Sequence, residues 1–191
     1  MPKIDAPTVV EHHARRRAAL LHAAAEIVAD GGLDALTLAA AGRATGLARS
    51  SVYQYFDSTP ALIAAMVEDL MPRSGHELAV VTARAGDPRA QVEAFVAAAL
   101  RTATDPTHRA LAALGTASLP PECAARVAEL HRDQEAPLRA ALAELPVPDP
   151  ELTAALLLGT VQGAVRAVES GRSLDEVTRR TLAVVRAVLG D

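Results

Sequence analysis

Apolar residues recur along this chain every three or four positions, which is the spacing of one face of an α-helix. No segment alternates apolar and polar residues convincingly enough to indicate a strand. Residues that start and stop helices divide the sequence into consecutive helical segments. The pattern predicts an all-α protein of about nine helices.

Three helices are expected before residue 57. The first should stop at Gly31 and Gly32, and Thr37 is a natural N-cap for the second. Gly46 permits a turn with positive φ between the second helix and the third. Their predicted ranges are 11–30, 38–45 and 48–55.

The rest of the chain repeats a helix start signal, a capping residue followed by proline. It occurs at Thr59-Pro60, Asp87-Pro88, Asp105-Pro106 and Asp149-Pro150. A capping box over residues 173–176 opens a last helix that runs to Leu189.

Prolines inside two of these segments should disturb the helices, because proline removes a helical hydrogen bond. The helix that starts at Pro60 is expected to be disturbed at Pro72 and Gly75. The segment over 120–145 is expected to be kinked or split at Pro137.

Composition agrees with a folded helical chain whose core is built from small side chains. Half of the 191 residues are hydrophobic and 22% are charged, while there is no Trp and only two Tyr and two Phe. The single cysteine, Cys123, excludes an internal disulfide and a cysteine-based zinc cluster, and we expect no metal or cofactor.

Neither a secretory leader nor a membrane anchor is expected. The arginines over 15–17 precede only a short Ala-rich run, which His22 and Glu26 interrupt. The longest uncharged stretch, over 152–165, is shorter than the roughly 20 residues that span a bilayer. The sequence therefore predicts a cytoplasmic protein with no membrane partner.

Charge is distributed unevenly, although the net charge is −4. Residues 1–56 carry six Lys and Arg against five Asp and Glu, whereas residues 57–191 carry thirteen against eighteen. The signs suit a DNA-facing N-terminal module on an acidic body.

The segment over 37–56 has the three parts of a helix-turn-helix: a short supporting helix, a glycine turn, and a second helix with one apolar and one polar face. Arg can bond guanine in two places, Gln can do the same to adenine, and hydroxyls can bond phosphates. The polar face has no acidic residue and carries Arg49, Ser50, Ser51, Tyr53 and Gln54. The alternative is two short helices of an Ala-rich bundle with no DNA partner.

Five short motifs in this region resemble the DNA-binding module of the tetracycline-repressor (TetR) family, in order and spacing over roughly residues 11–66. They are Gly32-Leu33-Asp34-Ala35, Thr37-Leu38, Thr45-Gly46-Leu47, Val52-Tyr53-Gln54-Tyr55-Phe56 and Leu62. The resemblance implies a helix-turn-helix domain over residues 1–58 and a helical ligand-binding and dimerisation domain over residues 59–191. It implies a DNA interface made by Thr37, Ala48, Arg49, Ser50, Ser51, Tyr53, Gln54, Tyr55 and Thr59.

Within that resemblance, Thr37 would touch phosphate, residues 49–51 would meet bases or nearby phosphates, and residues 53–55 would grip the DNA backbone. The arginines over 15–17 would lie near the DNA, unless they are an ordinary solvated helix start.

Three positions depart from the family's usual residues. Ala48 replaces a capping Ser or Thr, so the second helix lacks an N-cap worth about 1 kcal/mol. Thr59 stands where a phosphate-binding Lys is common, and Ala41-Gly42 should thin the packing beneath the turn.

The last two helices are expected to form a homodimer interface. The first of them is apolar nearly all round, and its Gly159 and Gly163 make a smooth strip for another helix. The predicted interface residues are Leu156, Gly159, Gly163, Val177, Val185 and Val188. The alternative is that both helices are buried only within one subunit.

Residues 87–170 are expected to enclose a small apolar effector. Phe95 is the only ring in this part of the chain, which excludes an aromatic cage and favours an aliphatic ligand. The candidate lining residues are Phe95, His108, Cys123, His131, Gln134, Thr160 and Gln162, although each could equally be an ordinary surface or helix-face residue.

The predicted function is therefore a transcription regulator, most simply a repressor that binds a palindromic operator as a homodimer and is released by a small molecule. Two other classes remain open: a helical module that binds protein, and an all-helical enzyme that acts on a small molecule. The sequence offers no acid–base pair, nucleophile motif, phosphate loop or metal spacing for an enzyme.

Overall fold

The computed structural model describes residues 9–102, 105, 109, 110, 119 and 121–190. These residues form eight α-helices and one 3-10 turn and contain no strand, which confirms the all-α prediction. None of these helices is both long enough and apolar enough to cross a membrane. The elements are α1 (Val9–Gly31), η1 (Leu33–Ala35), α2 (Leu38–Ala44), α3 (Arg49–Val52), α4 (Thr59–Ala83), α5 (Pro88–Thr102), α7 (Pro121–Ala143), α8 (Pro150–Glu169) and α9 (Leu174–Leu189).

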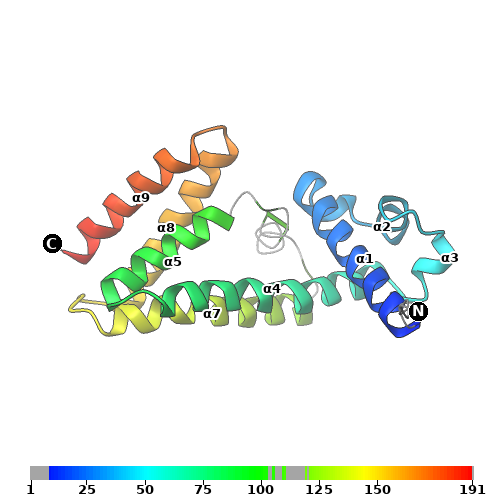
Figure 1. The fold of residues 1–191 in the computed structure, drawn as a ribbon, viewed down its shortest axis with the longest axis horizontal. Coiled ribbons are helices and arrows are strands. Elements are labelled where there is room, and N and C mark those ends of the chain that lie inside the picture. The colour runs from blue at the N-terminus through cyan, green and yellow to red at the C-terminus, as the bar shows by residue number, and fades with distance from the viewer. Residues whose placement is uncertain (1–8, 103–104, 106–108, 111–118, 120, 191) are drawn as a thin grey trace, which may run out of the picture.

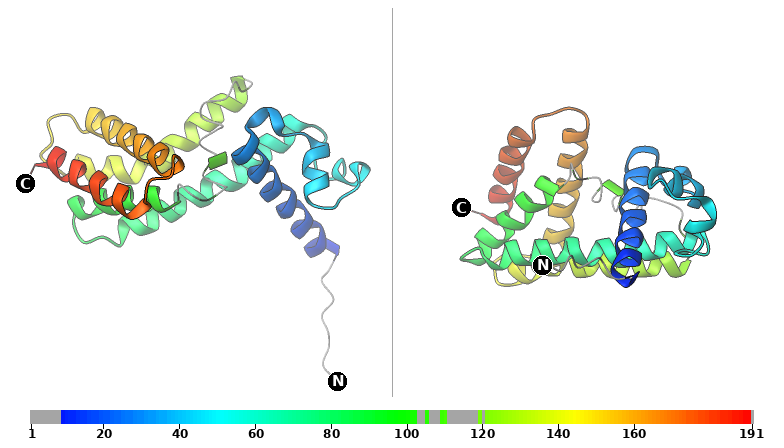
Figure 2. Two further views of the ribbon diagram at one scale, coloured as in Figure 1. Left: turned by 90° about the horizontal axis from the view of Figure 1, so that it is seen from above. Right: turned by 45° about the vertical axis from the view of Figure 1, so that its right-hand side comes forward.

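Two long helices, α4 and α7, lie side by side along the long axis of the molecule (Figure 1). Helices α1, α2 and α3 gather at one end of this pair, and α5, α8 and α9 gather at the other end. Figure 2 shows the same separation from two further directions. The N-terminal group and the C-terminal group are thus joined by α4, which belongs to both.

Most of the predicted helix starts are confirmed by their capping bonds. In each case a side-chain oxygen accepts from the backbone N–H three residues later, as an N-cap does. These bonds are Ala40 N to Thr37 at 3.0 Å, Ala90 N to Asp87 at 2.9 Å, Leu152 N to Asp149 at 3.0 Å and Glu176 N to Ser173 at 3.5 Å.

The start of α4 is a correction. Ser58 is its N-cap, in place of Thr59, and its Oγ accepts from Ala61 N at 3.2 Å. Ser58 holds the extended backbone that a cap requires, with φ −155° and ψ 162°, so Thr59 is already helical. The start signal at Asp105-Pro106 cannot be followed, because Pro106 lies outside the described residues.

Neither α4 nor α7 ends at its inner proline, so the predicted split of α7 is wrong, while the disturbance of α4 and the kink of α7 stay predictions. Helix α4 continues through Pro72 to Ala83, and α7 is not split at Pro137. In α4, Gly75 marks a close approach: a Cβ there would lie 3.2 Å from Cγ of Gln134 in α7. The Gln134 side chain also donates to the Met71 carbonyl at 3.3 Å. These contacts pack α7 against the turn of α4 that contains Pro72.

The core divides into two clusters of buried side chains. One joins α1, α2, α3 and the first half of α4 as far as Met71, and Val127 and Leu130 of α7 complete it. The other begins at Leu78 and joins α5, α8, α9 and the end of α7. The cores therefore divide within α4, and the domain boundary after residue 58 stays a prediction.

Candidate nucleic-acid interface and inner cavity

The crossing of α2 and α3 is made possible by Gly42. A Cβ on this residue would lie 2.8 Å from Cγ2 of Val52 and 3.1 Å from the Leu47 carbonyl oxygen. Val52 is fully buried and fills the space that Gly42 leaves. The small residue therefore brings the two helices into contact, in place of the thin packing that the sequence suggested.

The turn between these helices has the predicted left-handed glycine, because Gly46 has φ +68°. Leu47 N donates to the Gly42 carbonyl at 2.8 Å and closes the turn. Helix α3 covers only residues 49–52, fewer than expected, and residues 53–55 continue as turns. Ala48 is its N-cap and makes no side-chain capping bond, as predicted from its identity.

The nine predicted DNA contacts lie at one end of the molecule, on α2, α3 and the start of α4. Thr37, Ala48, Arg49, Ser50, Tyr53 and Gln54 are exposed, whereas Ser51, Tyr55 and Thr59 are half-buried. Arg49 Nη2 donates to the Tyr53 hydroxyl at 3.5 Å, and its guanidinium lies 6.0 Å from the centre of the Tyr53 ring. That hydrogen bond raises the pKa of Arg49 above its already high value. Arg49 is thus a permanent, exposed positive charge whose side chain Tyr53 orients.

Helix α1 supports the residues that follow α3. The His13 ring stacks on the Tyr55 ring, with centroids 4.5 Å apart and planes 29° apart. The Arg17 guanidinium lies 5.5 Å from the centre of the Phe56 ring, within the range of a cation–π contact. Sequence reasoning missed His13, and the only signal was the gathering of three of the four aromatic residues at 53–56.

A basic recess lies between the start of α1 and the turn of the helix-turn-helix. Its volume is about 320 Å³, and no acidic side chain lines it. The lining residues are His12, Arg15, Arg16, Ala19, Thr45 and Leu47. Two arginines beside the turn that leads into α3 can bind phosphate oxygens, which is the role expected for the start of α1.

A pocket of about 200 Å³ that is partly open to solvent, which we call the inner cavity, lies among α4, α5, α7 and α8. Four of the seven predicted effector contacts line it: Phe95, His131, Gln134 and Gln162. Cys123 and Thr160 do not, because Cys123 packs against the N-terminal core and the Thr160 hydroxyl donates to the Leu156 carbonyl of its own helix. His108 lies outside the described residues. The other lining residues are Leu78, Ala99, Arg109, Glu135, Leu158, Val161, Val165 and Glu169.

The polar groups around the inner cavity are largely occupied. Burial lowers the pKa of His131, and the nearby Glu135 carboxylate and Val127 backbone only partly oppose this, so the imidazole is neutral near pH 7. Glu135 accepts from Arg139 at 2.8 Å. Six of the twelve lining residues are apolar, five of them aliphatic together with Phe95, and they can pack against the expected apolar ligand. Arg109 is a lining cation that the sequence analysis did not identify.

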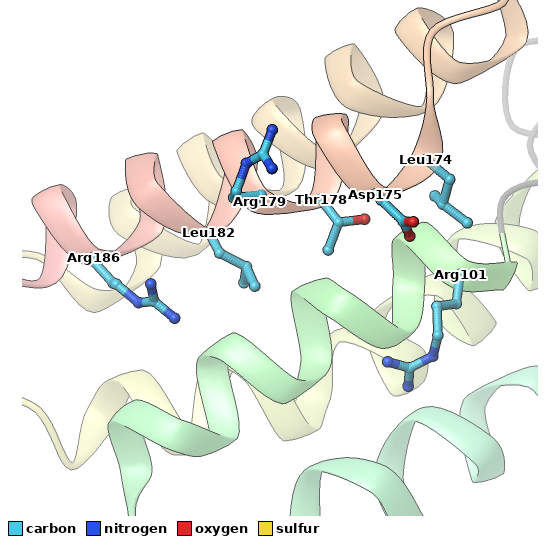
Figure 3. A pocket seen from close by; sticks show the side chains of 7 residues that line it. All are labelled: Arg101, Leu174, Asp175, Thr178, Arg179, Leu182 and Arg186. Atoms are coloured by element: carbon cyan, nitrogen blue, oxygen red, sulfur yellow. The ribbon is translucent and has the colours of Figure 1, made fainter.

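A second hollow, of about 360 Å³, lies between α5 and α9 and was not predicted (Figure 3). Three arginines and one aspartate line it together with Leu174, Thr178 and Leu182. Arg186 is held by two hydrogen bonds to Glu93, at 2.9 and 2.6 Å, which also lower the pKa of Glu93. The Thr178 hydroxyl is buried without a hydrogen-bond partner among the described residues.

Helices α8 and α9 expose an apolar face. Leu152 and Leu156 of α8 are 56% and 59% exposed, and Val184 and Val188 of α9 are 47% and 44% exposed. We call these four residues the α8–α9 face. Among the described residues, and apart from the backbone of α8 itself, no atom lies within 4 Å of a Cβ built on Gly159, and at Gly163 the nearest is 3.9 Å away. The chain itself therefore leaves this strip open.

Two of the six predicted interface residues belong elsewhere. Val177 is 8% exposed and Val185 is 1% exposed, and both pack in the C-terminal core. They lie on the side of α9 that faces its own chain, so another subunit cannot reach them. Leu152 of α8 and Val184 of α9 are exposed apolar residues that the sequence analysis did not name.

Residues 20–66 match the family described as bacterial regulatory proteins, tetR family. No curated protein matches the sequence. Three solved structures resemble nearly the whole chain. The fatty acid degradation regulator FadR from Bacillus halodurans has a TM-score of 0.76 at 17% identity, covering 92% of this chain and 95% of its own.

The other two structures contain ligands. FadR from Bacillus subtilis, in complex with stearoyl-CoA, has a TM-score of 0.74 at 15% identity, covering 88% of this chain and 96% of its own. AibR, in complex with isovaleryl coenzyme A and operator DNA, has a TM-score of 0.76 at 16% identity, covering 88% of this chain and 97% of its own. At these identities the likeness establishes the fold.

Proposed function

The chain belongs to the tetR family of bacterial regulatory proteins, and on that premise we propose that it is a repressor that binds a palindromic operator as a homodimer and leaves it when a small ligand fills the inner cavity. As a family member it is a DNA-binding transcriptional regulator, and regulators of this family generally catalyse no reaction.

The observation that carries the proposal is the exposed, acid-free face of α3. Arg49 stands on it with its side chain oriented by Tyr53, and Gln54 is exposed beside it. An Arg and a Gln can each make two bonds to a base edge in the major groove. The basic recess of α1 lies next to this face and supplies phosphate contacts.

The α8–α9 face supports a homodimer. Exposed Leu and Val side chains on two adjacent helices form an apolar surface that a second copy of the chain would bury. The open strip at Gly159 and Gly163 allows a helix of that copy to approach closely. A two-fold dimer presents two recognition helices to two half-sites, which is why we expect a palindromic operator.

The inner cavity supports control by a ligand with an aliphatic body. The cavity adjoins α4, and α4 also carries residues of the N-terminal core. A change in packing at the cavity can therefore alter the position of the helix-turn-helix. Among the solved structures of the same fold, one holds an acyl-CoA and another holds an acyl-CoA together with operator DNA.

The experiment is a selection of bound fragments from the source genome, followed by a salt titration of the enriched fragment. We expect enrichment of a palindromic sequence and binding that weakens as salt rises, since phosphate contacts release counterions. Arg49→Ala should lose the enrichment. Binding that is equal for all fragments would contradict a sequence-specific regulator, and no binding at all would favour a module that binds protein.

A further inference from the structure

Arg109 lies at the inner cavity and also reaches the DNA-binding end of the molecule. Its Nη2 donates to the Ala29 carbonyl at 2.8 Å and to an Asp30 carboxylate oxygen at 2.5 Å, both at the end of α1. The two contacts join residues 80 and 79 positions apart in the sequence. The same side chain lines the cavity. Arg109 therefore lines the cavity and, through its guanidinium, also contacts the end of the helix that supports the helix-turn-helix.

The end of α1 has no basic residue of its own in its last turn. The carbonyl groups there point out of the helix without helical donors and carry the negative end of the helix dipole. Gly32 N satisfies the Val28 carbonyl at 2.9 Å, and Arg109 satisfies the next one. Arg109 thus acts as a C-cap supplied by a distant segment of the chain. Its position affects the stability of the last turn of α1.

The pairing with Asp30 is open to competition. The Asp30 side chain is 74% exposed, whereas that of Arg109 is 32% exposed. An ion pair with one solvated partner contributes little, so a second anion held closer to Arg109 can replace it. Of the acids that line the cavity, Glu135 is paired with Arg139, and Glu169 is exposed, where water and salt screen it.

We propose that the effector is an aliphatic carboxylate: its chain lies against the apolar walls of the inner cavity, and its carboxylate takes Arg109 away from Asp30 and from the end of α1. This inference rests on the proposed function and names its ligand class and its switch. Loss of the Arg109 cap loosens the end of α1, whose start holds Tyr55 and Phe56 beneath the recognition helix. Operator affinity falls as a result.

The size of the cavity favours a short or medium chain. At about 200 Å³ it is smaller than the ~300–1,000 Å³ typical of sites for drug-sized ligands. Octanoate is therefore the probe, and octanamide is its uncharged isostere. Calorimetry is the suitable method, because the chain has no Trp to report binding by fluorescence.

Four proteins make the test: wild type, Arg109→Gln, Asp30→Asn, and Asp34→Asn as the matched control. Asp34 is an exposed carboxylate close to the end of α1, and no ion pair joins it to Arg109 among the described contacts. Wild type should bind octanoate at least about fivefold more tightly than octanamide, the lower end of typical coupling factors. Arg109→Gln should abolish that preference.

Asp30→Asn is the decisive variant, because it keeps Arg109 and removes its competitor. It should bind octanoate more tightly than wild type does and octanamide equally well, while Asp34→Asn changes neither. Octanoate should weaken operator binding by wild type and have less effect on Asp30→Asn.

Three results would overturn the inference: octanamide binding as tightly as octanoate, unchanged octanoate affinity in Asp30→Asn, or no octanoate binding by either protein. The Asp30→Asn result can be interpreted even if Arg109→Gln fails to fold. Operator binding by ligand-free wild type tests the proposed function separately. If only the octanoate experiments fail, the proposed DNA-binding function is not contradicted.

Discussion

At the scale of single residues, we expect the proposed DNA interface to depend most on Arg49. It is the one charged side chain within α3, and its position relative to Tyr53 is fixed by a hydrogen bond. If Arg49 contacts a base, we expect Arg49→Ala to weaken operator binding by about 1–3 kcal/mol. If it contacts a phosphate, the slope of log affinity against log salt concentration should become shallower by about 1.

Fluorescence anisotropy with labelled operator measures this effect. Arg172→Ala is the matched control, since Arg172 is an exposed arginine in the loop between α8 and α9, far from α3. Unchanged affinity in a folded Arg49→Ala protein would remove Arg49 from the interface.

Gly42 gives a second prediction at this scale. Gly42→Ala gains about 1 kcal/mol of helix propensity. The added methyl group would lie 2.8 Å from the stiff Val52 side chain, and overpacking of this kind costs about 1–3 kcal/mol. We therefore expect a net loss of roughly 1 kcal/mol in the free energy of unfolding, measured with urea, together with weaker operator binding. Gly86→Ala is the control, because nothing lies within 4 Å of a Cβ there; equal effects of the two variants would contradict the close crossing of α2 and α3.

His131 makes stability depend on pH. Burial lowers its pKa in the folded chain below the roughly 6.5 of a free imidazole. As pH falls below about 6.5, the unfolded chain takes up a proton that folded His131 resists, so the free energy of unfolding decreases toward the folded pKa. His131→Gln should remove this part of the loss between pH ~7.5 and ~5.5. Identical pH dependence of urea unfolding in the two proteins would show that His131 is not held neutral by burial.

At the scale of helices, the sequence predicted helix starts correctly where a single capping residue determines the start. Thr37, Asp149 and Ser173 cap the helices that they were predicted to cap, because a cap depends only on its own backbone and a donor three residues later. Pro72 does not end α4, and the turn that contains it contacts Gln134 of α7, some 60 residues away in the chain, which no local signal indicates.

The α8–α9 face yields the prediction for this scale. Leu156 is 59% exposed, so Leu156→Asp should change the stability of the folded chain by no more than about 0.5 kcal/mol. Burying a charge in an interface is unfavourable, and we expect the dimer to dissociate. Val10→Asp is the control, because Val10 is an even more exposed apolar residue, on α1. Sedimentation velocity at micromolar concentration measures the oligomeric state of each variant. A dimer that persists in Leu156→Asp would place the interface elsewhere.

At the scale of the whole molecule, the sequence predicted the helix-turn-helix and part of the cavity better than the contacts that connect them. The helix-turn-helix is a local pattern of twenty residues, and four cavity residues could be named in advance, three from their polarity and Phe95 from its aromatic ring. Arg109 could not, because neither helix periodicity nor spacing indicates that it reaches the end of α1 across 79 residues. Tertiary contacts of this kind carry any coupling between ligand and DNA, and they appear only in the folded chain.

The most direct measurement of the central claim is an equilibrium titration of the protein into its selected operator and into a scrambled duplex of equal length. We expect saturation at two chains per operator and an affinity at least about a thousandfold higher than for the scrambled duplex, the lower bound for specific regulators. Equal affinity for the two duplexes, or saturation at one chain, would contradict a homodimer that reads a palindromic operator through α3.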